Sequence, residues 1–155
     1  MLQQVCEDIH NMFIKEPYCG EFAIADGVIS PSLGLLEGQR FWITGSVLND
    51  GVYTYHADGI MNDDDTEEVG LQDETWAGTI CALAVPPAVI ALSAEISAWV
   101  DKYGDVVNSP YMSESVIGVY NYTKGSQNGS SGASKVVSWQ DVFGSQLNRW
   151  RKVSF

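Results

Sequence analysis

Apolar residues follow two different periods along the chain, and each period predicts a different kind of element. They recur every three or four positions over residues 2–14, 75–104 and 138–152, which is the spacing of amphipathic helices. Between residues 21 and 57 they instead alternate with polar residues, which is the spacing of β-strands. We therefore expect an α+β fold with a helical core, made of an N-terminal helix, a central helix pair and a C-terminal helix. A small antiparallel β-meander is inserted, and an extended arm follows the central helices.

Two turn signals lie within the predicted meander. Asp26-Gly27 separates two apolar alternations and predicts a two-residue hairpin, because both central positions of such a turn need a positive φ. The stretch "GSVLNDGVYTY" places Asn49-Asp50-Gly51 between two further β-prone runs. Hairpin chemistry explains this second turn as well, and nothing in it requires catalysis.

Several residues mark where the predicted helices begin and end. Pro17 should stop the first helix, and Pro87 should start the longest one, since proline is tolerated in a first helical turn. Gly104 stands at the expected C-terminal cap of that helix. Ser138 and Asp141 have the spacing of a capping box at the start of the last helix.

The predicted elements divide the chain into a core, a linker and a terminal helix. The core is residues 1–123, with a β-meander at 21–57, an acidic loop at 58–74, central helices at 75–104 and an extended arm at 109–123; a flexible Gly/Ser linker follows at 124–135, and a docking helix at 136–155.

The chain is strongly acidic, with a formal net charge of −12 from 20 acidic and 8 basic residues. Eight of the acids lie in the acidic loop, which contains no base. This balance argues against tight DNA binding, which needs clustered Lys and Arg, and also fits a surface past which DNA slides. Three widely spaced cysteines argue against a disulfide framework and fit a reducing compartment. The most apolar run has 13 residues and two prolines, so no membrane span is expected.

Each arrangement that could carry chemistry has a simpler explanation. The acidic loop can be laid over a calcium loop from Asp63 to Glu74, but Glu68 stands where that loop needs glycine. Cys6 and His10 are four residues apart on a predicted helix, a spacing that packing explains as well as metal binding does. We therefore expect no catalytic residue, no metal site and no cofactor.

Two other classes of function stay open. The chain could be a small metal-dependent hydrolase that uses His56, Cys81 or the acidic loop. It could also be a DNA mimic that blocks nucleases, although its acids gather in one loop and are not spread along a surface.

Five stretches in matching order resemble one protein family. They are "GQRFWITGS" with "NDGVYTY", "LQDETWAGTICALAVPPAVIALSAEISAWVDKYG", "SPYMSESVIGVYNYT", a Gly/Ser linker and "WQDVFGSQLNRWRKV". Together they are similar to head–tail connector proteins, also called head-completion or adaptor proteins, of tailed phages and prophages of Gram-positive bacteria. The 21–57 sheet departs from the family pattern, in which small connectors are nearly all helical.

The resemblance implies a structural virion protein without enzymatic activity. Such a protein assembles in the host cytoplasm into a homo-oligomeric ring, usually dodecameric, in the virion neck at the portal vertex. The ring joins head to tail and extends the DNA channel, through which DNA passes without specific binding. Its partners are the portal protein and a stopper or tail-completion protein, and no membrane is involved. A tail-completion or stopper protein of the same neck is the alternative role.

The resemblance also implies roles for three sets of residues. The residues expected to dock on the portal are Trp139, Phe143, Leu147, Arg149, Trp150, Arg151 and Lys152. The arm toward a neighbouring subunit carries Tyr111, Ser113, Glu114, Tyr120 and Tyr122. The acidic wall of the channel or its rim is formed by Asp63, Asp64, Asp65, Glu67 and Glu68.

Overall fold

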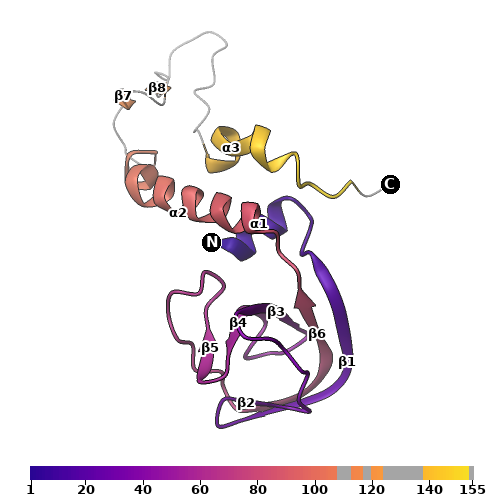
Figure 1. Ribbon diagram of the computed structural model, residues 1–155. Helices are drawn as coiled ribbons and strands as arrows, with labels where there is room; N and C mark the ends of the chain where they lie inside the picture. The colour runs from indigo at the N-terminus through magenta and orange to yellow at the C-terminus, as the bar shows by residue number, and fades with distance from the viewer. Residues whose placement is uncertain (108–112, 117–119, 124–137, 154–155) are drawn as a thin grey trace. The chain divides into compact units, whose positions relative to one another are not determined.

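The computed structural model describes residues 1–107, 113–116, 120–123 and 138–153 (Figure 1). The chain divides into two compact units. The first is Met1–Ala94 together with the segment that starts at Trp150, and the second is Glu95–Arg149. Among the described residues, no helix combines the length and apolarity that crossing a membrane requires.

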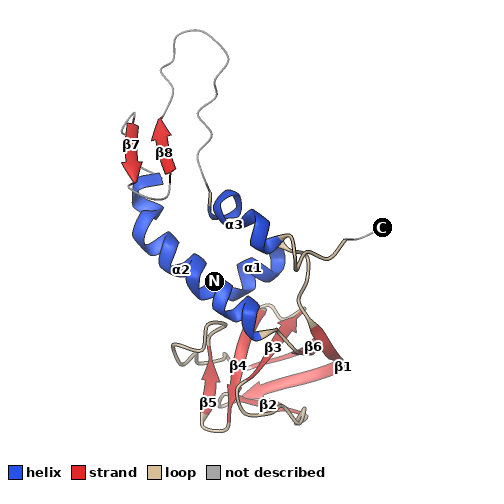
Figure 2. Ribbon diagram, turned by 45° about the horizontal axis from the view of Figure 1, so that its top comes forward, coloured by secondary structure: helices blue, strands red, loops and turns tan. Residues whose placement is uncertain are grey.

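A six-stranded antiparallel sheet dominates the first unit, so the prediction of a helical core is wrong. The strands are β1 (Ile14–Ala25), β2 (Val28–Ser30), β3 (Gln39–Thr44), β4 (Gly51–His56), β5 (Gly59–Met61) and β6 (Glu74–Leu83). Their order in the sheet is β2-β1-β6-β3-β4-β5, and the sheet curls into a half-barrel (Figures 1 and 2). The expected strands of the meander are present, but β6 comes between β1 and β3, so the sheet is not a simple meander.

Strand β6 replaces the first of the two predicted central helices. Trp76 is buried, while Thr75 and Ala77 on either side of it are exposed, which is the alternation of a strand. Gly78 also disfavours a helix at this position, whereas the β-branched residues of the segment favour a strand. Four consecutive buried residues end β6, and this continuous apolar run is what resembled a buried helix.

The Asp26-Gly27 hairpin prediction is confirmed. Ala25 pairs with Val28, and the two residues between them have φ values of 50° and 75°. In a two-residue hairpin the flanking residues exchange backbone hydrogen bonds, so Ala25 directs its N–H and C=O toward β2. The register of β1 against β6 is unbroken from Glu16 to Ile24. Backbone direction alternates along a strand, so the backbone of Pro17, an even number of residues before Ala25, points to the same side as that of Ala25, away from β6. Because β2 pairs only with the last residues of β1, Pro17 lies on an open edge, where it costs the sheet no hydrogen bond.

Both faces of the curled sheet carry packed apolar side chains. The larger cluster contains Phe22, Ile24, Phe41, Ile43, Ile60, Leu71, Trp76 and Ile80, and the smaller contains Val52, Cys81 and Leu83. Two aromatic pairs link neighbouring strands of the larger cluster. Phe22 lies 5.5 Å from Trp76 and Phe41 lies 5.7 Å from Tyr53, ring centre to ring centre, and each pair is in register across its strands. Such cross-strand pairs fix the register of a sheet.

The first helix is shorter than predicted. Helix α1 spans Leu2–Asp8 and buries Leu2, Val5 and Cys6. His10 and Phe13 both have a φ of 53°, so the backbone leaves the helix well before Pro17, which lies within β1. The periodic apolar pattern continued past the helix because Ile9 is buried and Met12 packs on the smaller sheet cluster.

The second unit contains the remaining helices and a separate hairpin. Helix α2 spans Pro87–Val107, so the predicted start at Pro87 is confirmed, whereas Gly104 lies inside the helix and does not cap it. Helix α3 spans Trp139–Leu147, and its Ser138–Asp141 capping box is confirmed. Strands β7 (Ser113–Val116) and β8 (Tyr120–Thr123) pair antiparallel in the predicted extended arm. The predicted linker at 124–135 lies outside the described residues.

Candidate functional site

The Asn49-Asp50-Gly51 stretch belongs to a long connection that Glu74 holds in place. Strand β3 ends at Thr44 and β4 begins at Gly51, so the connection is longer than the expected tight turn. One oxygen of Glu74 accepts from Val47 N at 2.9 Å. The other accepts from the Ser46 hydroxyl at 2.5 Å and from Leu48 N at 3.2 Å. The bond from Ser46 lowers the pKa of Glu74 most, because it favours the ionised carboxylate.

Asn49 ties the same connection to the segment just before β6 and to Glu74 at the start of that strand. Its side chain is 2% exposed. Its amide donates to Gln72 O at 3.0 Å and to Glu74 at 3.1 Å, while its carbonyl accepts from Gln72 N at 2.8 Å. The connection is therefore held in one conformation. Yet Val47 at its tip is 88% exposed and Leu48 is 50% exposed.

The acidic loop has a structural role in its first half. Asp63 accepts from Gln3 N at 2.8 Å and Asp64 accepts from Leu2 N at 3.2 Å. Both carboxylates also lie within 3.0 Å of the Met1 amino group. Two acids from a distant loop thus satisfy the N–H groups that open α1, where negative charge is also favoured by the helix dipole.

Replacing Asp63 with alanine should lower the free energy of unfolding by about 1–2 kcal/mol, because a charged cap of α1 is lost. Glu67→Ala is the matched control, since it removes the same charge from the same loop at an exposed position. This variant should change stability by less than about 0.5 kcal/mol. Urea denaturation of both variants measures the difference. Equal losses would show that the loop acts through its total charge and does not cap α1.

A groove of about 710 Å³ opens beside the other half of the acidic loop. Its walls are the β1–β2 hairpin, the segment that follows β2, the β4–β5 turn and residues 68–73. The apolar lining is Val28, Ile29, Leu33, Leu35, Ile60, Val69 and Leu71, and the acidic lining is Asp26, Asp58, Glu68 and Asp73. The lining also includes Tyr55 and His56, but no Lys or Arg.

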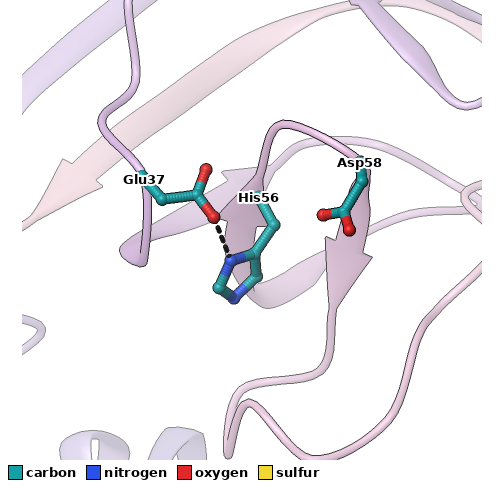
Figure 3. Close-up of side chains that lie close together, drawn as sticks. All are labelled: Glu37, His56 and Asp58. Atoms are coloured by element: carbon teal, nitrogen blue, oxygen red, sulfur yellow. Dashed lines mark hydrogen bonds and ion pairs between the residues drawn. The ribbon is translucent and has the colours of Figure 1, made fainter.

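His56 is the centre of a carboxylate cluster at this groove. Glu37 Oε1 lies 2.5 Å from the Nδ1 atom of its ring, and Asp65 Oδ1 lies 2.7 Å from Nε2. Glu37 is itself held by Ala57 N, which donates to its other oxygen at 2.9 Å. Glu37 and Asp58 lie on either side of His56 (Figure 3), and one donor atom from each of the three lies within 4.8 Å of the others.

Glu37 and the imidazole of His56 shift each other's pKa. The hydrogen bond with Glu37 is the main cause that raises the pKa of His56, and Asp65 adds to it. The same bond lowers the pKa of Glu37. The cluster therefore favours a positive charge between its acceptor atoms.

Sequence reasoning missed most of this cluster. The sequence places His56 among the candidate residues of a metal-dependent hydrolase, with Cys81 or the acidic loop, but Cys81 does not belong to the cluster. No local pattern in the sequence points to Glu37, because it comes from a loop that folding brings to the β4–β5 turn. A local signal did exist at the turn, since Ala57-Asp58 directly follows the alternating "GVYTYH" and precedes Gly59.

The other metal candidates do not assemble. Glu74 is engaged with the Ser46–Asn49 connection and Asp63 with α1, so the calcium-loop frame is not formed. Cys6 is buried, and burial raises its pKa to about 12. His10 lies beyond the end of α1 and is exposed, so it does not share a helical face with Cys6.

The predicted docking residues near the C-terminus have contacts within the chain. In the second unit, Phe143 meets Trp99 edge to face with 6.5 Å between ring centres. In the first unit, Trp150 meets Phe13 at 6.3 Å, and its carbonyl accepts from Asn11. Arg151 pairs with Asp8 at 2.9 Å.

The remaining predicted site residues differ in their exposure. Trp139 is half-buried and Leu147 is 1% exposed, while Arg149 and Lys152 are exposed; the backbone of Lys152 donates to Ile9 O at 2.9 Å. In the arm, Ser113 and Glu114 lie in β7, Tyr120 and Tyr122 lie in β8, and Tyr111 lies outside the described residues. Among the predicted channel acids, Asp65 contacts His56, and Glu67 and Glu68 are exposed.

Comparison of the chain with protein-family models, with curated proteins and with solved structures returned no match.

Proposed function

We propose that the chain is a structural protein of a phage neck, a ring-forming head–tail connector that binds the portal and extends the DNA channel. The resemblance of five ordered stretches to connector proteins suggests this role. The observation that supports it most is the exposed apolar tip Val47-Leu48 on a connection held by Glu74 and Asn49. An apolar surface that is already fixed loses little entropy on binding, which suits a contact between subunits.

The distribution of charge also supports a ring around DNA. Asp63 and Asp64 are committed to α1, but Glu67 and Glu68 remain exposed and carry charge into the solvent. Repeated around a ring, they would form an electronegative wall or rim that repels the DNA backbone. In this proposal the exposed Arg149 and Lys152 near the C-terminus dock on the portal.

Co-expression with the portal protein encoded in the same genome tests the proposal. We expect the two proteins to co-purify as a ring-shaped particle, seen by electron microscopy and weighed by native mass spectrometry. Val47→Asp combined with Leu48→Asp should abolish the multimer without lowering the Tm of the isolated chain. Val28→Asp is the matched control, because Val28 is also exposed, at 64%, but lies in β2. A chain that stays monomeric beside folded portal rings would contradict the proposal.

One observation favours the second neck role, that of a tail-completion or stopper protein. The curled half-barrel of six strands suits a part in which a small barrel-like domain forms a lower ring. Binding to the tail-tube protein of the same genome, with no binding to its portal, would select this role over the first.

A further inference from the structure

The groove beside His56 carries an excess of negative charge that its protein neighbours do not balance. Glu37, Asp58 and Asp65 are the carboxylates of the cluster, and His56 is its only basic group. The other charged residues that line the groove are Asp26, Glu68 and Asp73. A metal ion bound at Nδ1 requires a neutral imidazole, so the three carboxylates give the cluster a charge of −3, which one divalent cation would reduce to −1.

The two ring nitrogens of His56 have the partners that a metal-binding histidine needs. Asp65 beside Nε2 can hold the ring proton there, as carboxylates commonly do for metal-ligating histidines. The Nδ1 lone pair then faces Glu37 Oε1 at 2.5 Å. Two acceptor atoms this close need a proton between them, so a metal ion bound at Nδ1 would replace that proton and the two atoms would move apart.

The donor atoms are placed within reach of one ion. Glu37 is fixed from behind by Ala57 N, while Asp58 comes from the tight β4–β5 turn and directs its carboxylate toward the histidine (Figure 3). The three donor atoms lie within 4.8 Å of one another. Ligands of a tetrahedral zinc ion are about 3.4 Å apart, so the two exposed carboxylates need to move by about 1 Å.

We propose that Glu37, His56 and Asp58 bind a divalent transition-metal cation, with zinc as the preferred ion and Asp65 as the residue that orients the imidazole. One nitrogen and two carboxylate oxygens form a mixed donor set that suits zinc better than magnesium or calcium, which prefer oxygen alone. The ion would join the segment after β2, the β4–β5 turn and the acidic loop at one point. This site is independent of the connector role, and neither depends on the other.

Isothermal titration with zinc chloride at pH 7.5 tests the site on the full chain. A Cys19→Ser background, kept reduced, removes the one exposed thiol among the three cysteines. We expect one zinc ion per chain. His56→Ala or Asp58→Asn should weaken binding more than 100-fold, and Asp65→Asn should weaken it about 10-fold.

Two matched controls should leave zinc affinity unchanged. His10→Ala removes the other histidine of the chain, and Asp26→Asn removes a groove acid outside the cluster. NMR of the imidazole nitrogens gives a readout that does not depend on stability, since zinc should shift Nδ1 of His56 and leave Nε2 protonated. The proposal is overturned if 100 μM zinc leaves both nitrogens protonated, if binding survives His56→Ala, or if His10→Ala removes it.

Discussion

Replacing Gly78 with alanine is expected to lower the free energy of unfolding by about 3 kcal/mol, a fall in Tm of about 10 °C for a chain of this length. A Cβ atom at this position would lie 2.5 Å from the Thr44 carbonyl oxygen and 2.8 Å from the Trp76 ring. The first of these is backbone, which cannot rotate away. The clash arises where β3 stops pairing with β6, because the last paired residues there are Thr44 and Thr79.

Gly20 provides the matched control for this substitution. It pairs with Gly78 across β1 and β6, and a Cβ atom there would meet nothing within 4 Å. Alanine at Gly20 should therefore leave stability unchanged or raise it by up to about 1 kcal/mol, because the unfolded chain loses freedom. Guanidinium denaturation of the two variants gives the comparison. A loss at Gly20 as large as that at Gly78 would show that contact with Thr44 is not the cause.

Replacing Asn49 with alanine is expected to lower the free energy of unfolding by about 2–3 kcal/mol. The side chain is buried and makes three hydrogen bonds, two of them to the backbone of Gln72. Alanine leaves these groups without partners and frees the connection that carries Val47 and Leu48. Thermal unfolding measures the loss, and faster hydrogen exchange at the Val47 and Leu48 amides would report the released connection.

Asp50→Asn is the control for the same connection. Asp50 accepts from Gly45 N on the exposed side, and asparagine keeps that acceptor, so the change in stability should stay below about 0.5 kcal/mol. The double variant Asn49→Ala with Glu74→Gln tests the hydrogen-bond network directly. Because Asn49 and Glu74 share a hydrogen bond, their combined loss should be smaller than the sum of the separate losses. Additive losses would mean that the two residues act independently.

The sequence predicted the local features whose cause is local. The Asp26-Gly27 hairpin, the start of α2 at Pro87 and the Ser138–Asp141 capping box all depend on residues that are neighbours in the chain. The identity of β6 depends instead on strands that come before it, since β1 and β3 pair with it on either side. Its buried end has an apolar run that fits a helix or a strand equally well.

The candidate site was harder to predict from the sequence for the same reason. Glu37, His56 and Asp65 come from three segments that meet only after the sheet curls, and no spacing in the sequence links them. The resemblance to connector proteins implies an acidic channel wall or rim for the run from Asp63 to Glu68. Two of its acids, Asp63 and Asp64, cap a helix some sixty residues earlier in the chain, a contact that charge alone could not reveal.

The position of Pro17 limits how copies of this chain can join. It faces the open edge of β1 and offers a carbonyl without an amide, so a strand from another molecule would meet a gap in the ladder there. Lys15, Glu16 and Glu21 add exposed charges along the same strand. Continuous cross-molecule sheets, and the fibres they lead to, are therefore blocked at this edge even when many copies crowd together. An ordered multimer must therefore use other surfaces of the molecule, either side-chain contacts or a different strand edge.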